Sequence, residues 1–95
     1  MSAIVGLLTL SLHVIDAVTL KDKRQVIKSL IGRIEHRYNV SVAEVGDLGS
    51  RSDAEVAVAF VANEEAHVHR VLNEVARFIE ADSRADVGTV EIEVL

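Results

Sequence analysis

The stretch "TLKDKRQVIKSLIGRIEHRYNVSVAEV" (residues 19–45) changes from helical to strand periodicity, and this change decides the fold. Thr19, followed three residues later by Asp22, has the form of a capping box, in which each side chain satisfies a free backbone amide at a helix start. Apolar residues then recur at three-to-four spacing and predict one buried helical stripe, made of Val26, Ile27, Leu30, Ile31, Ile34 and Tyr38. Residues 40–45 alternate as a short strand. The stretch therefore predicts a helix followed by a strand.

The flanking segments add three strands and a second helix. Residues 3–15 alternate, with Leu8, Leu10 and Leu12 on one side and Thr9, Ser11 and His13 on the other, which is typical of a long strand. A polar loop with two glycines leads to a third strand at residues 55–62. Asn63 then has the position of a helix cap, and the apolar stripe of that helix ends at Ile79. Val90, Ile92 and Val94 alternate with glutamates in a last strand, which suits a sheet edge.

The resulting order is strand, helix, strand, strand, helix, strand. Right-handed crossovers put both helices on one face of a four-stranded antiparallel sheet, so we predict an α+β, ferredoxin-like βαββαβ sandwich with the first and third strands central. The 95 residues fit one domain, and we expect residues 1–95 to form it.

The composition argues against several kinds of site. Without cysteine there is no disulfide, thiolate nucleophile or cysteine metal site, and no apolar run reaches the roughly 18 residues of a membrane span. We expect a cytoplasmic protein without a membrane partner. His67 and His69 are two residues apart on a helix, diverge by about 200° and cannot chelate one ion, so no metal site is predicted.

Motifs for catalysis are also missing from the sequence. It contains no P-loop, Gly-rich dinucleotide turn, nucleophile elbow or HExxH motif, so we predict a protein that is not an enzyme and has no cofactor. The alternative is an enzyme that acts on a phosphorylated small molecule, which a phosphate bound at the start of the first helix would favour.

The charge is distributed unevenly along the chain. The net charge is −5, yet residues 21–38 carry six cations against two anions and are therefore +4, which leaves −9 for the rest. Such segregation allows a local basic patch on an acidic protein. Lys21, Arg24 and Lys28 lie within about 60° on the face opposite the apolar stripe, while Arg33 and Arg37 line one flank.

Folding alone does not account for these cations. The pairs Arg24 with Lys28 and Arg33 with Arg37 place like charges at i,i+4, which costs roughly 0.2–0.5 kcal/mol each. Lys21, Lys23 and Arg24 lie at the helix start, where free amides and cations favour a phosphate site. We therefore predict contacts with the RNA backbone, or with a ribosomal particle, from six residues: Lys21, Lys23, Arg24, Lys28, Arg33 and Arg37. The alternative is that these side chains are simply solvated or pair with acidic residues elsewhere.

The sheet face that the helices leave open predicts a different partner. Base-stacking aromatic residues of the RRM type are missing there, since the expected positions hold Thr9, Ser11 and His13. Small apolar residues are expected on this face instead: Val5, Leu7, Ala43, Val45, Ala57, Ala59 and Val61. An apolar face left in water is unusual, so the alternative function is a homodimer that packs sheet face to sheet face as a structural or protein-interaction module.

The stretch from Thr19 to Glu44, with "LTLSLHV" before it and "VAFVANEEAHVHRVLNEVARFIE" after it, resembles the YlxP-like proteins, small uncharacterised proteins of bacteria. The most specific part is an S/T-L-K-[DE]-K-R run followed by an aliphatic helix and an N-V-S-V-A-E strand; the run falls here on Leu20, Lys21, Asp22, Lys23 and Arg24. The resemblance implies a ferredoxin-like fold, a bacterial cytoplasmic protein and no assigned activity. It also implies a link to translation, because genes of the family often lie beside those for translation initiation and ribosome-binding factors. The family's common Trp between strands two and three is absent from "GDLGSRSD" here.

Overall fold

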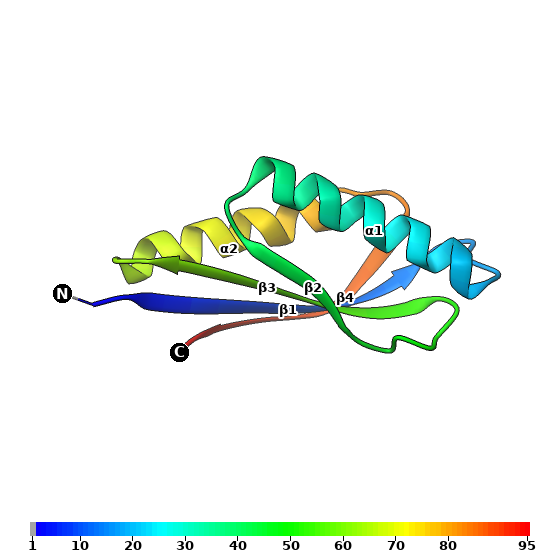
Figure 1. Ribbon diagram of the computed structural model, residues 1–95, viewed down its shortest axis with the longest axis horizontal. Helices are drawn as coiled ribbons and strands as arrows, with labels where there is room; N and C mark the ends of the chain where they lie inside the picture. Colours follow the sequence, from blue (N-terminus) through cyan, green and yellow to red (C-terminus); the bar gives the residue numbers. More distant parts are fainter. Residues whose placement is uncertain (1) are drawn as a thin grey trace.

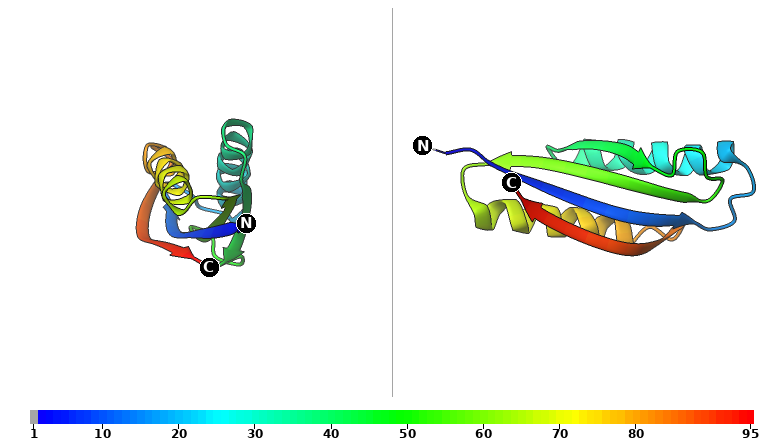
Figure 2. Two further views of the ribbon diagram at one scale, coloured as in Figure 1. Left: turned by 90° about the vertical axis from the view of Figure 1, so that its left-hand side faces the viewer. Right: turned by 90° about the horizontal axis from the view of Figure 1, so that it is seen from below.

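A computed structural model describes residues 2–95 as a four-stranded antiparallel sheet with both helices on one face (Figures 1 and 2). The elements follow one another as β1 (Ile4–Val14), α1 (Leu20–Arg37), β2 (Ser41–Gly46), β3 (Asp53–Ala62), α2 (Glu65–Glu80) and β4 (Ala85–Val94). The strand order is β2-β3-β1-β4, so β1 and β3 are central. The predicted ferredoxin-like α+β fold is therefore confirmed.

Alternation along the strands separates a buried face from an open one. Leu8 of β1 lies opposite Val58 of β3 and Ile92 of β4, and it points toward the helices with the rest of the apolar row. The core combines this row with the stripes of α1 and α2, whose buried members include Leu30, Ile34, Leu72 and Ile79. Aliphatic burial of this kind is the main stabilising term of the fold.

A glycine lets α2 approach β1 closely. A Cβ atom added to Gly6 would overlap Val68 Cγ1 and would lie 2.7 Å from Leu72 Cδ1, both on α2. The position therefore requires a residue without a side chain, for reasons of space and not of backbone conformation.

Several boundaries differ from those predicted, as at β3, which begins at Asp53 and not at residue 55. The N-cap of α2 is Glu64, which makes no side-chain capping hydrogen bond, so the prediction that Asn63 caps this helix is wrong by one residue. The strand β4 begins at Ala85, five residues earlier than the alternation from Val90 indicates. The cause is a register shift in the pairing with β1, where Leu10 lies opposite Val90 but Leu12 lies opposite Val87, so the two halves of β4 alternate out of phase.

Neither α1 nor α2 has a stretch long and apolar enough to cross a membrane, and these are the helices within residues 2–95.

Candidate functional site

The first turn of α1 is organised by its capping box. Thr19 Oγ1 accepts a hydrogen bond from the Asp22 amide at 3.1 Å, and Asp22 Oδ2 accepts from the amides of Thr19 and Val18 at 3.0 and 3.1 Å. The hydrogen bond from the Thr19 amide is the largest cause of a lowered pKa for the Asp22 carboxyl. A carboxylate thus occupies the helix start, where an anionic ligand was expected. The predicted phosphate site at these amides has to be corrected, because a phosphate would meet the negative charge of Asp22.

Lys23 does not face solvent beside Lys21 and Arg24, as the phosphate site would require. Its side chain is 0% exposed, and its Nζ donates hydrogen bonds to the carbonyl oxygens of Asp47 at 2.8 Å and Asp53 at 3.0 Å. The two carbonyls lie on either side of the β2–β3 loop. Lys23 therefore fastens the first turn of α1 to both ends of this loop, and its prediction as an exposed RNA contact is wrong.

The charge of Lys23 is matched by Glu44 of β2. Lys23 Nζ lies 3.1 Å from Glu44 Oε2, which is buried and accepts no hydrogen bond among residues 2–95. The contact is thus an ion pair without hydrogen-bond geometry, and the ammonium is the group that compensates the carboxylate. The pair joins the two ends of the Thr19–Glu44 stretch, so Lys23 and Glu44 are explained by the fold.

Three other cations of α1 are exposed and form what we call the basic strip, made of Lys21, Arg24 and Lys28. Within the described residues no ion pair joins any of them to a carboxylate. They border a small hollow of about 230 Å³ together with Leu20 and Gln25. The structure therefore places these three cations at the surface, as their predicted position opposite the apolar stripe requires.

The remaining predicted cations lie on the side of α1 that faces α2, around the aromatic ring of Phe78. The Arg33 guanidinium carbon is 5.1 Å from the ring centroid and that of Arg37 is 5.3 Å away, both within cation–π range. Tyr38 meets the same ring edge-on at 5.8 Å, and Arg37 also lies 5.7 Å from the Tyr38 ring. Arg33 and Arg37 are therefore exposed, and their guanidinium groups are ordered against aromatic rings.

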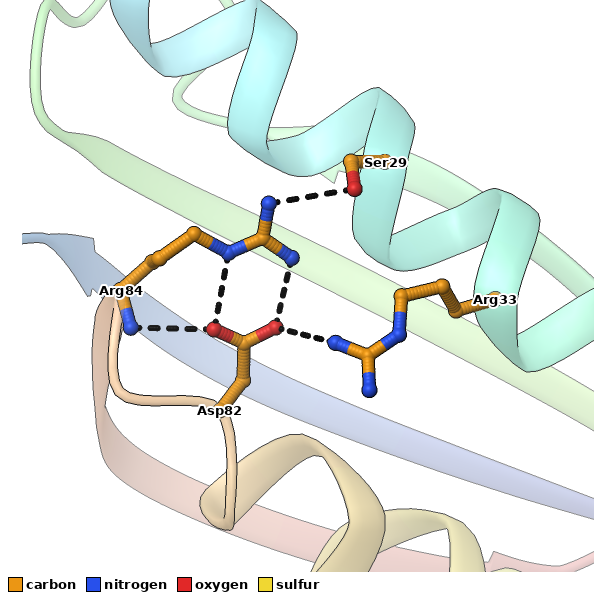
Figure 3. Close-up of polar contacts among 4 residues, drawn as sticks. All are labelled: Ser29, Arg33, Asp82 and Arg84. Atoms are coloured by element: carbon orange, nitrogen blue, oxygen red, sulfur yellow. Dashed lines mark hydrogen bonds and ion pairs between the residues drawn. The ribbon is translucent and has the colours of Figure 1, made fainter.

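Asp82, in the α2–β4 loop, binds two arginines at once (Figure 3). Its Oδ2 accepts from Arg33 at 3.0 Å and from Arg84 at 2.7 Å, while its Oδ1 accepts from Nε and the amide of Arg84, each at 3.0 Å. Arg84 Nη1 also donates to Ser29 Oγ of α1 at 3.1 Å. The Asp82 side chain is 4% exposed, and hydrogen bonding by Arg84 lowers its pKa to about 2. This network connects α1 to the end of α2, and it agrees with the alternative that part of the basic charge pairs with acids elsewhere.

Arg33, Arg37 and Phe78 border an open groove of about 690 Å³, which we call the α1–α2 groove. It is lined by Gln25, Lys28, Ser29, Gly32, Arg33, His36, Arg37 and Phe78. Because Gln25 and Lys28 also border the smaller hollow, the two depressions adjoin along α1. Sequence reasoning missed Phe78, Asp82 and Arg84. Their sequence neighbourhood carries no signal, since they meet α1 only through tertiary packing.

The open sheet face has the opposite charge. None of the four strands contains Lys or Arg. Five acids pair with open-face residues of β1 and therefore lie on the same face of the sheet. They are Asp53, Glu55, Asp86, Glu91 and Glu93. His13, between Asp53 and Asp86 in neighbouring strands, contacts Asp53 Oδ1 at 2.9 Å. Both helices cover the other face of the sheet (Figure 2), so the exposed cations of α1 and the acids of the open sheet face are separated by the sheet.

Apolar residues occupy the same open face, as predicted. Val5 lies opposite Val61, Leu7 opposite Ala59, and Ala43 opposite Ala57. Val5, Val45 and Val61 are 37%, 50% and 60% exposed. Within residues 2–95 no three His, Cys, Asp or Glu side chains are placed to hold a metal ion.

Comparison with known proteins identifies the family to which this chain is similar. The model of a family described as "Protein of unknown function (DUF503)" matches residues 5–92. An uncharacterised protein of Bacillus subtilis (strain 168), YlxP, is 30% identical over 66 residues, which are 70% of this chain and 72% of YlxP. The predicted resemblance to YlxP-like proteins is thereby confirmed.

Among solved structures, a de novo designed protein, Foldit4, matches with a TM-score of 0.59 and 17% identity, over 99% of this chain and 97% of the design. At that identity the match shows a shared fold alone.

Proposed function

This chain belongs to the DUF503 family of proteins of unknown function, and from its exposed cations we propose that it is a non-catalytic module that binds RNA, in a ribosomal particle, through phosphate contacts. A ribosomal partner implies a cytoplasmic location. The contacts come from the basic strip together with Arg33 and Arg37; Lys23 is no longer among them.

One observation carries the proposal: the exposed cations of α1 form a continuous basic path, although the protein as a whole is acidic. Lys21 and Arg37 are 16 residues apart, which corresponds to about 24 Å along a helix. An elongated polyanion such as an RNA strand fits a path of that length, whereas a single small anion does not. The acids under the sheet repel RNA from the opposite face, so the contact has one orientation.

Salt dependence tests the proposal. Each neutralised phosphate contributes about −0.7 to the slope of log affinity against log salt for single strands, so five cations give a slope of roughly −3.5. We expect fluorescence anisotropy with fragments of ribosomal RNA to show such a slope. Co-sedimentation with ribosomal subunits should fall over the same salt range.

A pair of charge reversals identifies the surface. Arg24→Glu combined with Lys28→Glu removes two cations of the basic strip and should reduce both the affinity and the slope. The matched control is Arg70→Glu with Arg77→Glu, which changes the net charge equally at two exposed positions of α2. Equal binding by the wild type and the Arg24/Lys28 variant would refute the proposal.

A homodimer is a second candidate function, favoured by the exposure of Val5, Val45 and Val61 on the open sheet face. The acids of this face would repel one another across a symmetric interface, so high salt should strengthen the dimer while it weakens RNA binding. Size exclusion with light scattering at micromolar concentration tests this candidate. A monomer at every salt concentration would exclude the sheet-face interface.

A further inference from the structure

The α1–α2 groove has the size of a small-ligand site, and it owes part of its space to a glycine in α1. Its volume of about 690 Å³ falls within the range of roughly 300–1,000 Å³ that is typical of such pockets. Part of the space exists because α1 carries a glycine at position 32. A Cβ atom added there would meet no heavy atom within 4 Å, so a larger side chain at this position would extend into open space.

The groove combines a flat surface with positive charge. The guanidinium groups of Arg33 and Arg37 lie against the ring of Phe78, at 5.1 and 5.3 Å from its centroid. Guanidinium planes and aromatic rings are the two kinds of surface on which unpaired RNA bases stack. Among the described residues Arg37 has no carboxylate partner, so its guanidinium is available to a ligand.

The surrounding contacts hold this surface in place. Asp82 fixes Arg33 and Arg84, and Arg84 reaches across to Ser29 of α1 (Figure 3). The groove and its border carry an excess of three positive charges. Four cations contribute, Lys28, Arg33, Arg37 and Arg84, and one anion, Asp82. A planar group with negative charges on either side is complementary to such a groove, and a base within an RNA strand is such a group.

We propose that the α1–α2 groove receives an unpaired base of single-stranded RNA, stacked on the Arg37–Phe78 surface, while flanking phosphates contact Lys28 and Arg33. This inference rests on the proposed RNA-binding function and specifies its ligand: single-stranded RNA with accessible bases, in preference to duplex RNA. Stacking tolerates every base, so no strong sequence preference is expected.

The test compares strands that differ only in their bases. Fluorescence anisotropy should measure wild-type binding to a labelled ten-nucleotide oligoadenylate, to an abasic ribose-phosphate strand of equal length and to an RNA duplex of equal length. Stacking of one base corresponds to a preference of roughly 5- to 150-fold for the oligoadenylate over the abasic strand. A poly-glutamate peptide serves as a polyanion without bases.

Gly32→Leu is the decisive variant, because it extends a bulky side chain into the groove and leaves every charge in place. It should remove the preference for oligoadenylate over the abasic strand and keep the salt slope. Ala66→Leu, which adds the same side chain at an exposed position of α2, is the matched control and should bind as the wild type does. Phe78→Leu should also reduce the preference. If that variant does not fold, Gly32→Leu still decides the matter.

The outcomes separate this inference from the proposed function. Equal, salt-dependent binding of oligoadenylate and abasic strand by the wild type would overturn the groove site and leave the phosphate contacts standing. Binding of the duplex alone would overturn the groove site, and failure to bind the oligoadenylate, the abasic strand and the duplex would overturn both proposals. A preference that persists in Gly32→Leu would place stacking elsewhere, and tighter binding of poly-glutamate than of oligoadenylate would indicate an acidic protein segment instead; either result would overturn the groove site as an RNA site.

Discussion

Replacing Lys23 with methionine tests whether the most specific motif of the chain is structural. The ammonium donates to the carbonyls of Asp47 and Asp53 and compensates Glu44 at 3.1 Å, in a side chain that is 0% exposed. Methionine preserves most of the volume of the stem but leaves two carbonyls and a largely buried carboxylate without a partner.

The expected loss follows from these contacts. Each hydrogen bond from a charged donor contributes roughly 1.5–3 kcal/mol, and removing one partner of a buried ion pair costs about 3–5 kcal/mol. Glu44 is partly exposed, and methionine avoids the cost of desolvating an ammonium, so we expect the free energy of unfolding to fall by about 3 kcal/mol. For a domain of this size that corresponds to a decrease in Tm of roughly 12–24 °C.

Urea denaturation followed by circular dichroism measures the loss. Lys21→Met removes an exposed cation of the same type and should change the free energy of unfolding by less than about 0.5 kcal/mol. A double-mutant cycle with Glu44→Gln gives the coupling within the pair. The reasoning would be refuted by a Lys23→Met protein as stable as Lys21→Met, or by one that stays folded yet loses the salt slope of RNA binding.

Three further predictions concern other contacts of the fold. Asp82→Asn should lower the free energy of unfolding by about 2 kcal/mol at pH 7, since the pKa of this carboxyl falls from 3.8 to about 2. Because the folded-state pKa is depressed, this contribution is present above about pH 4 and disappears as the pH falls toward 2, so wild type and variant should converge in acid denaturation there. Gly6→Ala should destabilise by roughly 1–3 kcal/mol through overlap with Val68 and Leu72, measured by thermal unfolding, and an unchanged Tm would contradict that packing. Gly32→Ala should raise the free energy of unfolding by up to about 1 kcal/mol, because alanine favours a helix interior and its Cβ meets no neighbour; a loss in urea denaturation would show that the groove is closed in solution.

Local patterns were sufficient to predict the element order and much of the packing. The Thr19–Asp22 capping box, the stripe of α1 and the alternation of β1 each arise within a few residues, and each is present as predicted. The β4 start was hidden because its bulge breaks the alternation between Val87 and Val90.

The site was harder to predict. Lys23 was assigned to it by its charge, without regard to where it lies relative to the buried stripe of the helix. Lys23 precedes Ile27 and Leu30 by four and seven residues, which puts it in the buried stripe, and this spacing was available in the sequence. Phe78 and Asp82 gain their roles only when the end of α2 meets α1, 40 or more residues away from Arg33 and Arg37 in the chain. No local sequence pattern predicts such a tertiary contact.

The separation of charge between α1 and the open sheet face makes the molecule an electric dipole across its helix and sheet layers. In the field of a polyanion a dipole experiences a torque, so the protein would turn its α1 side toward the surface before any contact forms. Its association rate would then depend on the local field and less on the net charge of −5. The same torque would direct Glu91 and Glu93 outward, so a bound molecule presents a negative surface to whatever approaches next.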